Sequence, residues 1–445
     1  MLIFWGSLWL RFRGRKMSDT MIKQMPKYES YKESGEQWID KVPSHWEIVK
    51  LKHLFYEKKH RQNMSLSCGA ISFGHVIQKD DSKTPLSTKV SYQEVLRGEF
   101  LINPLNLNYD LKSLRIGLSY IDVVVSAGYI VLKERSEIDK EYFKFLLHRY
   151  DVAYMKLLGS GVRQTINFNH IANSLLALPP LEEQKWISSF LNKKTAQIDE
   201  AMAIKQKQIE LLKERKQIII QQAVTQGLNP DVPMKDSDVD WIGTIPEHWN
   251  VKRLKYVLEE RNERSKTGEE PLFMVSQVHG LVVRADYHEK AEVAASNIDS
   301  KIVYKNDLVF NKLKAHLGVF FKSNIDFKGL VSPDYAVYKS KAYISDMKIL
   351  ELLFRHPSYI EQFVIRATGI VEGLIRLYTN ELFDIAVPIA PENEQREIIS
   401  FVESESLKYD QAIAIQVQQI EKLKEYKTTL INSAVTGKIN VTELA

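Results

Sequence analysis

The sequence WIDKVPSHW at residues 38–46 returns as WIGTIPEHW at residues 241–249, so that each shared residue lies 203 positions from its counterpart. Leu51-Lys52 and Leu254-Lys255 extend the match at the same offset. Because the whole chain has only 7 tryptophans, two tryptophan pairs in one register indicate an internal duplication. We call residues 38–46 and 241–249 the two copies of the tryptophan motif.

A second repeated block follows each copy of the tryptophan motif, at an offset of 211. It starts with Pro-x-x-Glu-Gln at residues 180–184 and 391–395, which we call the glutamine motif, and it ends with Ala-Val-Thr at residues 223–225 and 434–436. The offset grows because the region between the two blocks is longer in the second half. The chain is therefore organised as module, helix, module, helix.

The second block of each half predicts a long helix. Each copy starts at a proline, has acidic residues in its first turn and contains no internal Gly or Pro. Apolar residues recur at spacings of three, four and seven, which is typical of a coiled-coil seam. At about 1.5 Å per residue each helix would be roughly 65–70 Å long. The predicted seam consists of Ile187, Leu191, Ile198, Met202, Ile209, Leu212 and Ile219 in the first helix and Ile398, Val402, Tyr409, Ile413, Ile420, Leu423 and Leu430 in the second.

The modules before the helices are predicted to be α+β. Residues 123–125, 129–132, 308–310 and 335–338 are short apolar runs bounded by Gly, Asn, Asp or Ser, as expected for strands. Residues 140–158 and 345–366 are predicted to be helical. We therefore expect an N-terminal extension at 1–26, a first module at 27–180 with its helix at 181–227, and a second module at 228–390 with its helix at 391–445.

Composition and charge narrow the possible functions without deciding among them. The 445 residues are 44% hydrophobic and 26% charged, as in globular proteins with proper cores. A net charge of +5 permits nucleic-acid binding but is far from that of a non-specific DNA coat. The single cysteine, Cys68, excludes a disulfide framework, fits a reducing cytoplasm and is expected to be a small buried hydrophobe.

The N-terminus contains an apolar run, Leu2 to Leu10, with its basic residues after it. A secretory signal has its charges before the run, and nine residues are too few to cross a bilayer. We expect residues 1–16 to be an upstream extension, with Met17 or Met21 as the more natural start and residues up to 26 disordered. A membrane-surface anchor is the alternative.

The order of these motifs resembles the specificity subunit of type I restriction-modification systems. The matching elements are the two tryptophan motifs, a Gly159-Ser160-Gly161 turn, the two glutamine motifs and the Ala-Val-Thr end of each long helix. The likeness covers nearly everything after residue 27. The second module departs from the pattern at its turn, which has Thr368-Gly369 and a separate Gly373.

This resemblance implies that each module is a target recognition domain for half of a bipartite site in double-stranded DNA. It also implies that the two long helices pair antiparallel as a ruler, and that two methyltransferase subunits and two motor-nuclease restriction subunits assemble on the chain. The chain would then bind no cofactor itself. S-adenosylmethionine, and ATP with Mg²⁺ in the restriction form, would belong to the partners.

Two motif matches could indicate catalysis by the chain itself. Asn103-Pro104-Leu105-Asn106 partly matches the motif with which amino-methyltransferases hold a flipped adenine, but it lacks the second proline and the aromatic. Pro333-Asp334 with Asp346-Met347-Lys348 fits a loose nuclease pattern, which occurs easily by chance among 56 acidic residues. The 11 histidines form no tight cluster that predicts a metal site. We therefore expect no catalytic or metal site.

Basic and amide residues in the loops of the modules are the candidate DNA contacts. Arg can bridge guanine O6 and N7, and Asn or Gln can bridge adenine N6 and N7, although phosphate contact or a solvated surface explains such residues as well. The alternative function is a coiled-coil scaffold with two protein-binding modules. The candidates are Lys112, Arg115, Arg163, Gln164 and Asn167 in the first module and Lys312, Lys314, His316 and Arg376 in the second.

Overall fold

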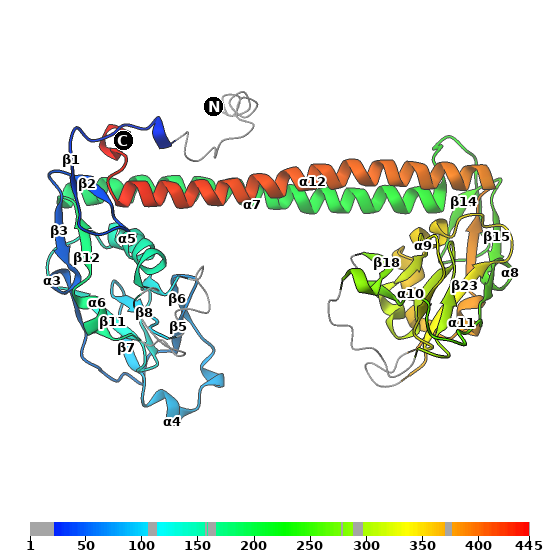
Figure 1. Cartoon of the computed structure of the whole chain (residues 1–445), viewed down its shortest axis with the longest axis horizontal. Helices are drawn as coiled ribbons and strands as arrows, with labels where there is room; N and C mark the ends of the chain where they lie inside the picture. The colour runs from blue at the N-terminus through cyan, green and yellow to red at the C-terminus, as the bar shows by residue number, and fades with distance from the viewer. Residues whose placement is uncertain are drawn as a thin grey trace. The chain divides into compact units, whose positions relative to one another are not determined.

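The computed structural model describes residues 22–105, 114–155, 158, 166–276, 279–287, 297–369 and 376–444, without the side chains of Ala315 and His316. The chain forms two compact units. The first unit consists of Met1–Gln206 with Val417–Ala445, and the second consists of Lys207–Gln416. Each unit contains one α+β module together with one part of each long helix (Figure 1).

The first module is built from small antiparallel sheets. Its four-stranded sheet has the order β4-β11-β8-β9, and the pairs β1-β2, β3-β12, β7-β10 and β5-β6 surround it. The strands are β1 (Tyr31–Glu33), β2 (Lys41–Pro43), β3 (Glu47–Lys50), β4 (Phe55–Glu57), β5 (Gly69–Ser72), β6 (His75–Gln78), β7 (Gln93–Val95), β8 (Phe100–Ile102), β9 (Ile116–Leu118), β10 (Val123–Val125), β11 (Ile130–Glu134) and β12 (Leu175–Leu178). The helices are α3 (Leu51–Leu54), η1 (Asp81–Lys83), α4 (Leu86–Lys89), α5 (Lys140–Ala153) and α6 (Phe168–Ala172).

The second module repeats this topology pair by pair. Its four-stranded sheet has the order β16-β23-β20-β21, with the pairs β13-β14, β15-β24, β19-β22 and β17-β18. The strands are β13 (Met234–Asp236), β14 (Thr244–Pro246), β15 (Asn250–Arg253), β16 (Leu258–Glu260), β17 (Phe273–Ser276), β18 (Gly280–Val283), β19 (Lys301–Val303), β20 (Leu308–Asn311), β21 (Phe320–Lys322), β22 (Gly329–Val331), β23 (Tyr335–Ser340) and β24 (Ala386–Ile389). The helices are α8 (Leu254–Val257), η3 (Arg284–Asp286), η4 (Lys312–Leu317), α9 (Lys348–Leu353), α10 (Pro357–Arg366) and α11 (Thr379–Phe383).

All four predicted strand segments are strands, as β10, β11, β20 and β23. The segment 345–366, predicted to be helical, forms two helices, α9 and α10, with a break between them. Pro357 stands at the first turn of α10, where its missing N–H costs nothing, and the ring of His356 accepts the N–H of Ser358. The predicted helix 140–158 is also shorter, since α5 ends at Ala153.

Each module has a core around the second tryptophan of its tryptophan motif. Trp46 is 0% exposed and Trp249 is 1% exposed, so both indole rings are core side chains. Cys68 is also fully buried, as predicted. Ile22 and Met25, from the segment expected to be an extension, pack against the first core.

The two long helices are α7 (Leu181–Gln226), close to the predicted 181–227, and α12 (Glu392–Val435), which starts close to where predicted but ends before the predicted residue 445. Each follows its proline directly, since the N–H of Gln184 donates to the carbonyl of Pro180 and that of Gln395 to Pro391. The short helix η5 (Val441–Glu443) follows α12.

Parts of both long helices pair within each unit. In the first unit Ile187, Leu191 and Ile198 share a core with Leu430 and Ala434. In the second unit Ala223 and Val224 share a core with Ile398 and Val402. The N-terminal part of α7 therefore packs against the C-terminal part of α12, and the C-terminal part of α7 packs against the N-terminal part of α12. The predicted antiparallel pairing is confirmed. Every predicted seam residue is buried or half-buried.

Ion pairs between the helices repeat in the same antiparallel register. Lys427 holds both carboxylate oxygens of Asp199 at 2.6 and 2.7 Å in the first unit, and Lys216 holds both oxygens of Asp410 at 2.8 Å in the second. The two aspartates are counterparts in the sequence repeat, and so are the two lysines. The helix pairing therefore follows the internal duplication.

Candidate DNA-recognition interface and module–helix junctions

The first module joins its helix through Glu183 in the first turn of α7. His45 follows β2 and its Nε2 lies 2.9 Å from Glu183 Oε2, and the hydroxyl of Tyr28 donates to Glu183 Oε1. The Glu183 side chain is only 8% exposed. Burial, followed by the hydrogen bond to Glu183, raises the pKa of Tyr28 far above its usual value. A carboxylate here is stabilised by these donors and by the helix N-terminus.

The second module repeats this arrangement with a different donor. His248 Nε2 lies 2.7 Å from Glu394 Oε2, and the indole N–H of Trp249 donates to the same oxygen at 3.0 Å. In both units the histidine of the tryptophan motif thus meets the glutamate of the glutamine motif. We call these two sites the first and second junctions.

The glutamine of each glutamine motif is buried at the junction, where its side-chain amide binds backbone groups. Gln184 is 2% exposed and Gln395 is 1% exposed. Gln184 Nε2 donates to the carbonyl of Pro179 and its Oε1 accepts the N–H of Asp139, which caps α5. Gln395 Nε2 donates to the carbonyls of Ala390 and Tyr343. Each amide therefore ties the start of the long helix to the end of a strand and to the segment before a module helix.

The C-terminal end of the other long helix completes each junction. Gly437, just after α12, has a φ of +69° and a Cβ on it would lie 2.3 Å from Pro43 Cδ in the first unit. Gly227, just after α7, has a φ of +76° and a Cβ would lie 2.8 Å from Glu394 Oε1 in the second. Glycine is needed at both ends for conformation and for space.

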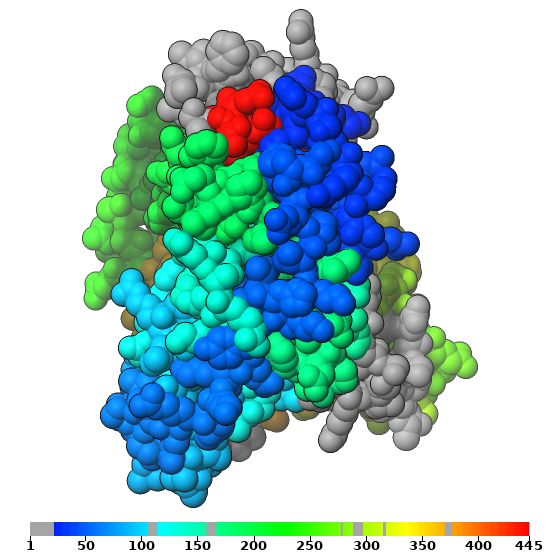
Figure 2. Space-filling model, turned by 90° about the vertical axis from the view of Figure 1, so that its left-hand side faces the viewer, coloured from blue at the N-terminus to red at the C-terminus, as the bar shows by residue number. Residues whose placement is uncertain are grey.

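The two chain ends meet in the first unit. The N–H of Asn440 donates to the carbonyl of Pro26 at 2.8 Å, and Lys438 pairs with Asp40 at 3.1 Å. Figure 2 shows this C-terminal segment, in red, beside the N-terminal segments in blue. Its place corresponds to that of the linker that leads from α7 into the second module.

A second repeated contact lies inside the modules and was missed by the sequence analysis. Lys58 donates to Glu99 at 2.9 Å in the first module, and Arg261 holds both oxygens of Asp307 at 2.8 and 3.0 Å in the second. Both acids also accept a nearby backbone N–H. The two ion pairs occupy corresponding places in the two modules, but the first consists of Lys and Glu and the second of Arg and Asp. A search for identical residues in the two halves therefore did not find them.

Two of the five candidate DNA contacts of the first module lie in the described part of the chain. Arg115 is half-buried just before β9, and its backbone N–H donates to Asp151. Asn167 caps α6, where its side chain accepts the N–H of His170. The other candidates, Lys112, Arg163 and Gln164, lie outside the described residues, together with the Gly159-Ser160-Gly161 turn.

Two candidates of the second module are brought together by backbone bonds. Arg376 pairs with Thr368, and the next residue, Leu377, donates to the carbonyl of Lys312 at 3.2 Å. Burial lowers the pKa of Lys312, whose Nζ lies 3.8 Å from Glu260. Lys314 is exposed, and the side chain of His316 lies outside the described residues. DNA contact by these nine residues remains a prediction.

The acidic residues of the loose nuclease pattern have structural partners. Asp346 pairs with Lys322 at 2.7 Å and accepts the N–H of Lys348, whose own ammonium bonds Glu351. Asp334 is exposed. Within the described ranges no group of three or more His, Cys, Asp or Glu could hold a metal ion.

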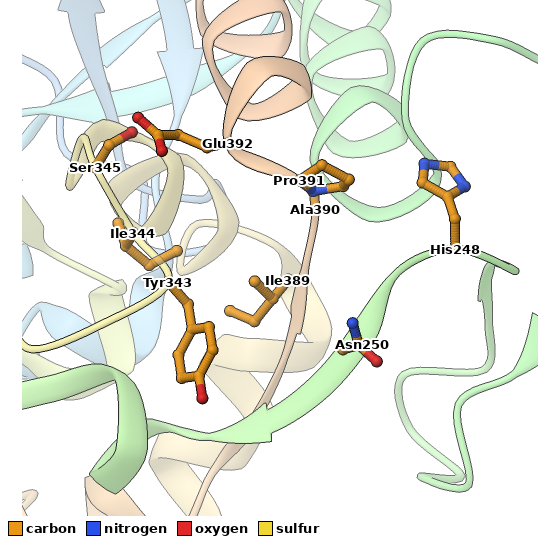
Figure 3. Close-up of a pocket in the computed structure, with 9 residues that line it drawn as sticks. All are labelled: His248, Asn250, Tyr343, Ile344, Ser345, Ile389, Ala390, Pro391 and Glu392. Atoms are coloured by element: carbon orange, nitrogen blue, oxygen red, sulfur yellow. The ribbon is translucent and has the colours of Figure 1, made fainter.

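A surface pocket of about 430 Å³ lies beside the second junction. Figure 3 shows His248 and Asn250 on one side, Tyr343, Ile344 and Ser345 on the other, and Pro391 at the start of α12 between them. Its lining mixes polar side chains with apolar ones, among them Ile344 and Ile389. In the part of the chain that the structure describes, no helix is both long and apolar enough to cross a membrane.

Comparisons with known proteins find the same duplicated arrangement of α+β modules and paired long helices. Residues 105–213 match the family described as type I restriction modification DNA specificity domain. Two specificity subunits from Methanocaldococcus jannaschii align over nearly their whole length. The type I restriction enzyme MjaVIII specificity subunit is 21% identical, and the putative MjaX specificity subunit is 24% identical, each over 95% of this chain and 99% of the relative.

Solved structures show the same fold. A chain from a type I restriction-modification system has a TM-score of 0.62 at 15% identity, covering 88% of this chain and 98% of that chain. The HsdS subunit of Thermoanaerobacter tengcongensis has a TM-score of 0.52 at 16% identity, covering 89% and 98%. The chain is therefore similar in sequence to type I restriction-modification specificity subunits over nearly its whole length, and it shares the fold of the solved ones.

Proposed function

We propose that this chain recognises a bipartite target in double-stranded DNA, one half-site for each module. The observation that carries the proposal is the duplication of the whole junction, in which His45 and Glu183 correspond to His248 and Glu394. Two modules fastened in the same way to paired helices suit a protein that presents two separate reading surfaces. The spacing between the half-sites would then depend on the helices.

We further infer that the chain is the assembly hub for two methyltransferase subunits and, in the restriction form, two motor-nuclease subunits. Methylation of adenine with S-adenosylmethionine, and cleavage driven by ATP with Mg²⁺, would be carried out by these partners. The exposed parts of the long helices and modules would bind them, and the complex would work in the cytoplasm.

Expression of the chain with its neighbouring methyltransferase, followed by mapping of methylated adenines across a genome, tests this function. We expect one motif of two specified halves with an unspecified spacer. A methyltransferase that marks the same sites without this chain would contradict the proposal. The scaffold alternative is separated by duplex binding, which should weaken steeply with salt because phosphate contacts release counterions.

The non-catalytic role has its own test. Replacing Asp334 and Asp346 with Asn should leave restriction by the complete complex unchanged, since Asp346 already pairs with Lys322 and accepts the N–H of Lys348. Restriction assays are compared with the unfolding midpoint and DNA affinity of each variant. Loss of cleavage with folding and binding intact would show that these carboxylates act in catalysis.

A further inference from the structure

The tip of the β5–β6 hairpin in the first module has an unusual residue. Ser72 pairs with His75, which leaves Phe73 and Gly74 as a two-residue loop. Their φ values are +47° and +78°. Such a loop needs positive φ at both positions and favours Asn, Asp or Gly there, whereas a bulky aromatic residue is a genuine outlier.

Other non-glycine residues with positive φ have a structural explanation. Asp40, Asp238, Asp299 and Asn306 are residue types that tolerate this conformation. Tyr343, the other aromatic one, accepts the amide of Gln395 with its carbonyl, and Lys252 lies 5.5 Å from its ring centroid. The Phe73 side chain is instead 75% exposed. Phe73 thus has an unfavourable backbone conformation and contributes nothing to a core.

The backbone beneath this exposed ring is firmly held. The N–H of Gly74 donates to the carbonyl of Leu114 at 3.2 Å. A Cβ on Gly117 of β9 would lie 2.7 Å from the carbonyl oxygen of Gly74, and a Cβ on Gly74 would lie 3.0 Å from His148 Nε2. The hairpin tip therefore sits directly on β9 and on α5. A rigid scaffold that presents a strained, exposed side chain is typical of a binding site.

The position of the tip indicates its ligand. Leu114, to which Gly74 is bonded, immediately precedes Arg115, a candidate DNA contact. The next residue after the tip, His75, is exposed and adds a polar group. An exposed aromatic ring beside basic and polar groups suits a nucleic-acid groove, where Phe contacts the thymine methyl group or the face of a base.

The equivalent hairpin of the second module differs at its tip. Ser276 pairs with Gly280, so three residues, Gln277, Val278 and His279, separate the strands there. The strands themselves correspond to β5 and β6 in the repeated topology. A change confined to the tip is what two copies of one fold need if they read different bases. We propose that Phe73 makes an apolar contact with the bases of the half-site that the first module recognises.

This inference rests on the proposed function, and three variants of the full chain with its methyltransferase test it. Phe73→Ala removes the ring, and Phe73→Gly removes the ring and also relieves the backbone. Leu86→Ala is the matched control, because Leu86 is 74% exposed on α4 of the same module. The measurements are duplex affinity at several salt concentrations, thermal unfolding and the methylated motif.

We expect both Phe73 variants to bind the cognate duplex about tenfold more weakly, as for the loss of one base contact. The salt dependence should be unchanged, because no phosphate contact is lost. The methylated motif should relax at one position of a single half-site, and Phe73→Gly should melt above the parent protein. Leu86→Ala should match the parent.

Three results would overturn the inference. They are unchanged affinity and motif in Phe73→Ala, an equal loss in Leu86→Ala, and weakened association with the methyltransferase in the absence of DNA. The last would make Phe73 a protein contact. A parent complex that methylates no bipartite motif would instead remove the proposed function itself, so the two failures are distinguishable.

Discussion

The two junctions place a glutamate in the same position but supply its hydrogen bonds from different residues. Glu183 is held by His45 and by Tyr28, which lies before the repeat begins, whereas Glu394 is held by His248 and Trp249 from within the repeat. Trp46, the counterpart of Trp249, has no partner for its Nε1 in the described part of the chain. The difference teaches that both junctions give the carboxylate at the helix start a histidine and one further donor, and that the identity of this further donor is free.

The largest effect is expected from exchanging one module. If the junctions are equivalent, residues 249–391 can be replaced by those of a relative without disturbing the first unit. One half of the methylated motif should then change completely while the other stays as it was. Methylome sequencing of the exchange variant beside the parent checks this. A change in both halves would mean that the modules do not read separately.

Lengthening the helices should have the next largest effect. Seven residues inserted after Gln206 in α7 and after Gln418 in α12 keep the seam in phase and add about 10 Å, or about three base pairs of duplex. We expect a spacer longer by about three base pairs with both half-sites unchanged. Seven flexible residues inserted at the exposed Asp231, in the linker after α7, are the control and should leave the spacer unchanged. An unaltered spacer in the active helix variant would exclude the helices as the ruler.

Removing the junction glutamates should lower stability measurably. Glu183→Ala leaves two donors without an acceptor at a site only 8% exposed, and we expect a loss of about 2 kcal/mol in the free energy of unfolding. Glu394→Ala should cost less, because Glu394 is 19% exposed and its partner His248 is 43% exposed. Denaturant unfolding measures both.

Glu182→Ala and Glu392→Ala are matched controls for these variants. Both side chains lie in the same helix turns but are 70% and 61% exposed. They should change stability by less than about 0.5 kcal/mol. A loss as large as in Glu183→Ala would show that the helix dipole, rather than the junction, accounts for the effect.

The smallest effects are expected at the paired helices. Replacing Asp199 by Lys and Lys427 by Asp should each cost about 0.2–1 kcal/mol, and the double reversal should restore most of it. The same cycle at Asp410 and Lys216 should give a similar coupling energy, because the geometry repeats. Coupling energies that differ widely between the two pairs would contradict the symmetry of the pairing. Coupling energies that survive 1 M salt would contradict an ionic origin of the coupling, because salt screens exposed charges.

The long helices were predictable because their signals are local and repeated. The prolines, the first-turn acids and the apolar spacing placed both ends of α7 and the start of α12 within about two residues, whereas α12 ends at Val435 rather than at residue 445. The strand order was not predictable, since the pairing of β4 with β11 joins residues far apart in the sequence. The break between α9 and α10 could have been expected from Pro357.

The candidate site was only partly accessible from the sequence. His45 and Glu183 are in the two repeated motifs, and their recurrence was a signal that they meet. Tyr28 gave no such signal, because its counterpart 203 positions later is Asp231. Asn167 is of a residue type that can read bases, but in the structure its side chain caps α6. The sequence could not separate these two roles, because an asparagine side chain suits a helix cap as well as a base contact.

The division of the chain also sets the order in which its units can be completed during synthesis. The second unit is one continuous stretch, Lys207–Gln416, whereas the first needs Val417–Ala445 to cover a module made long before. Leu430, Ala434 and Val435 leave the ribosome only after the whole second unit, yet they belong to the first core. The first module therefore keeps an uncovered apolar surface until α12 has been made, which makes the newborn chain most prone to aggregation at its N-terminal half.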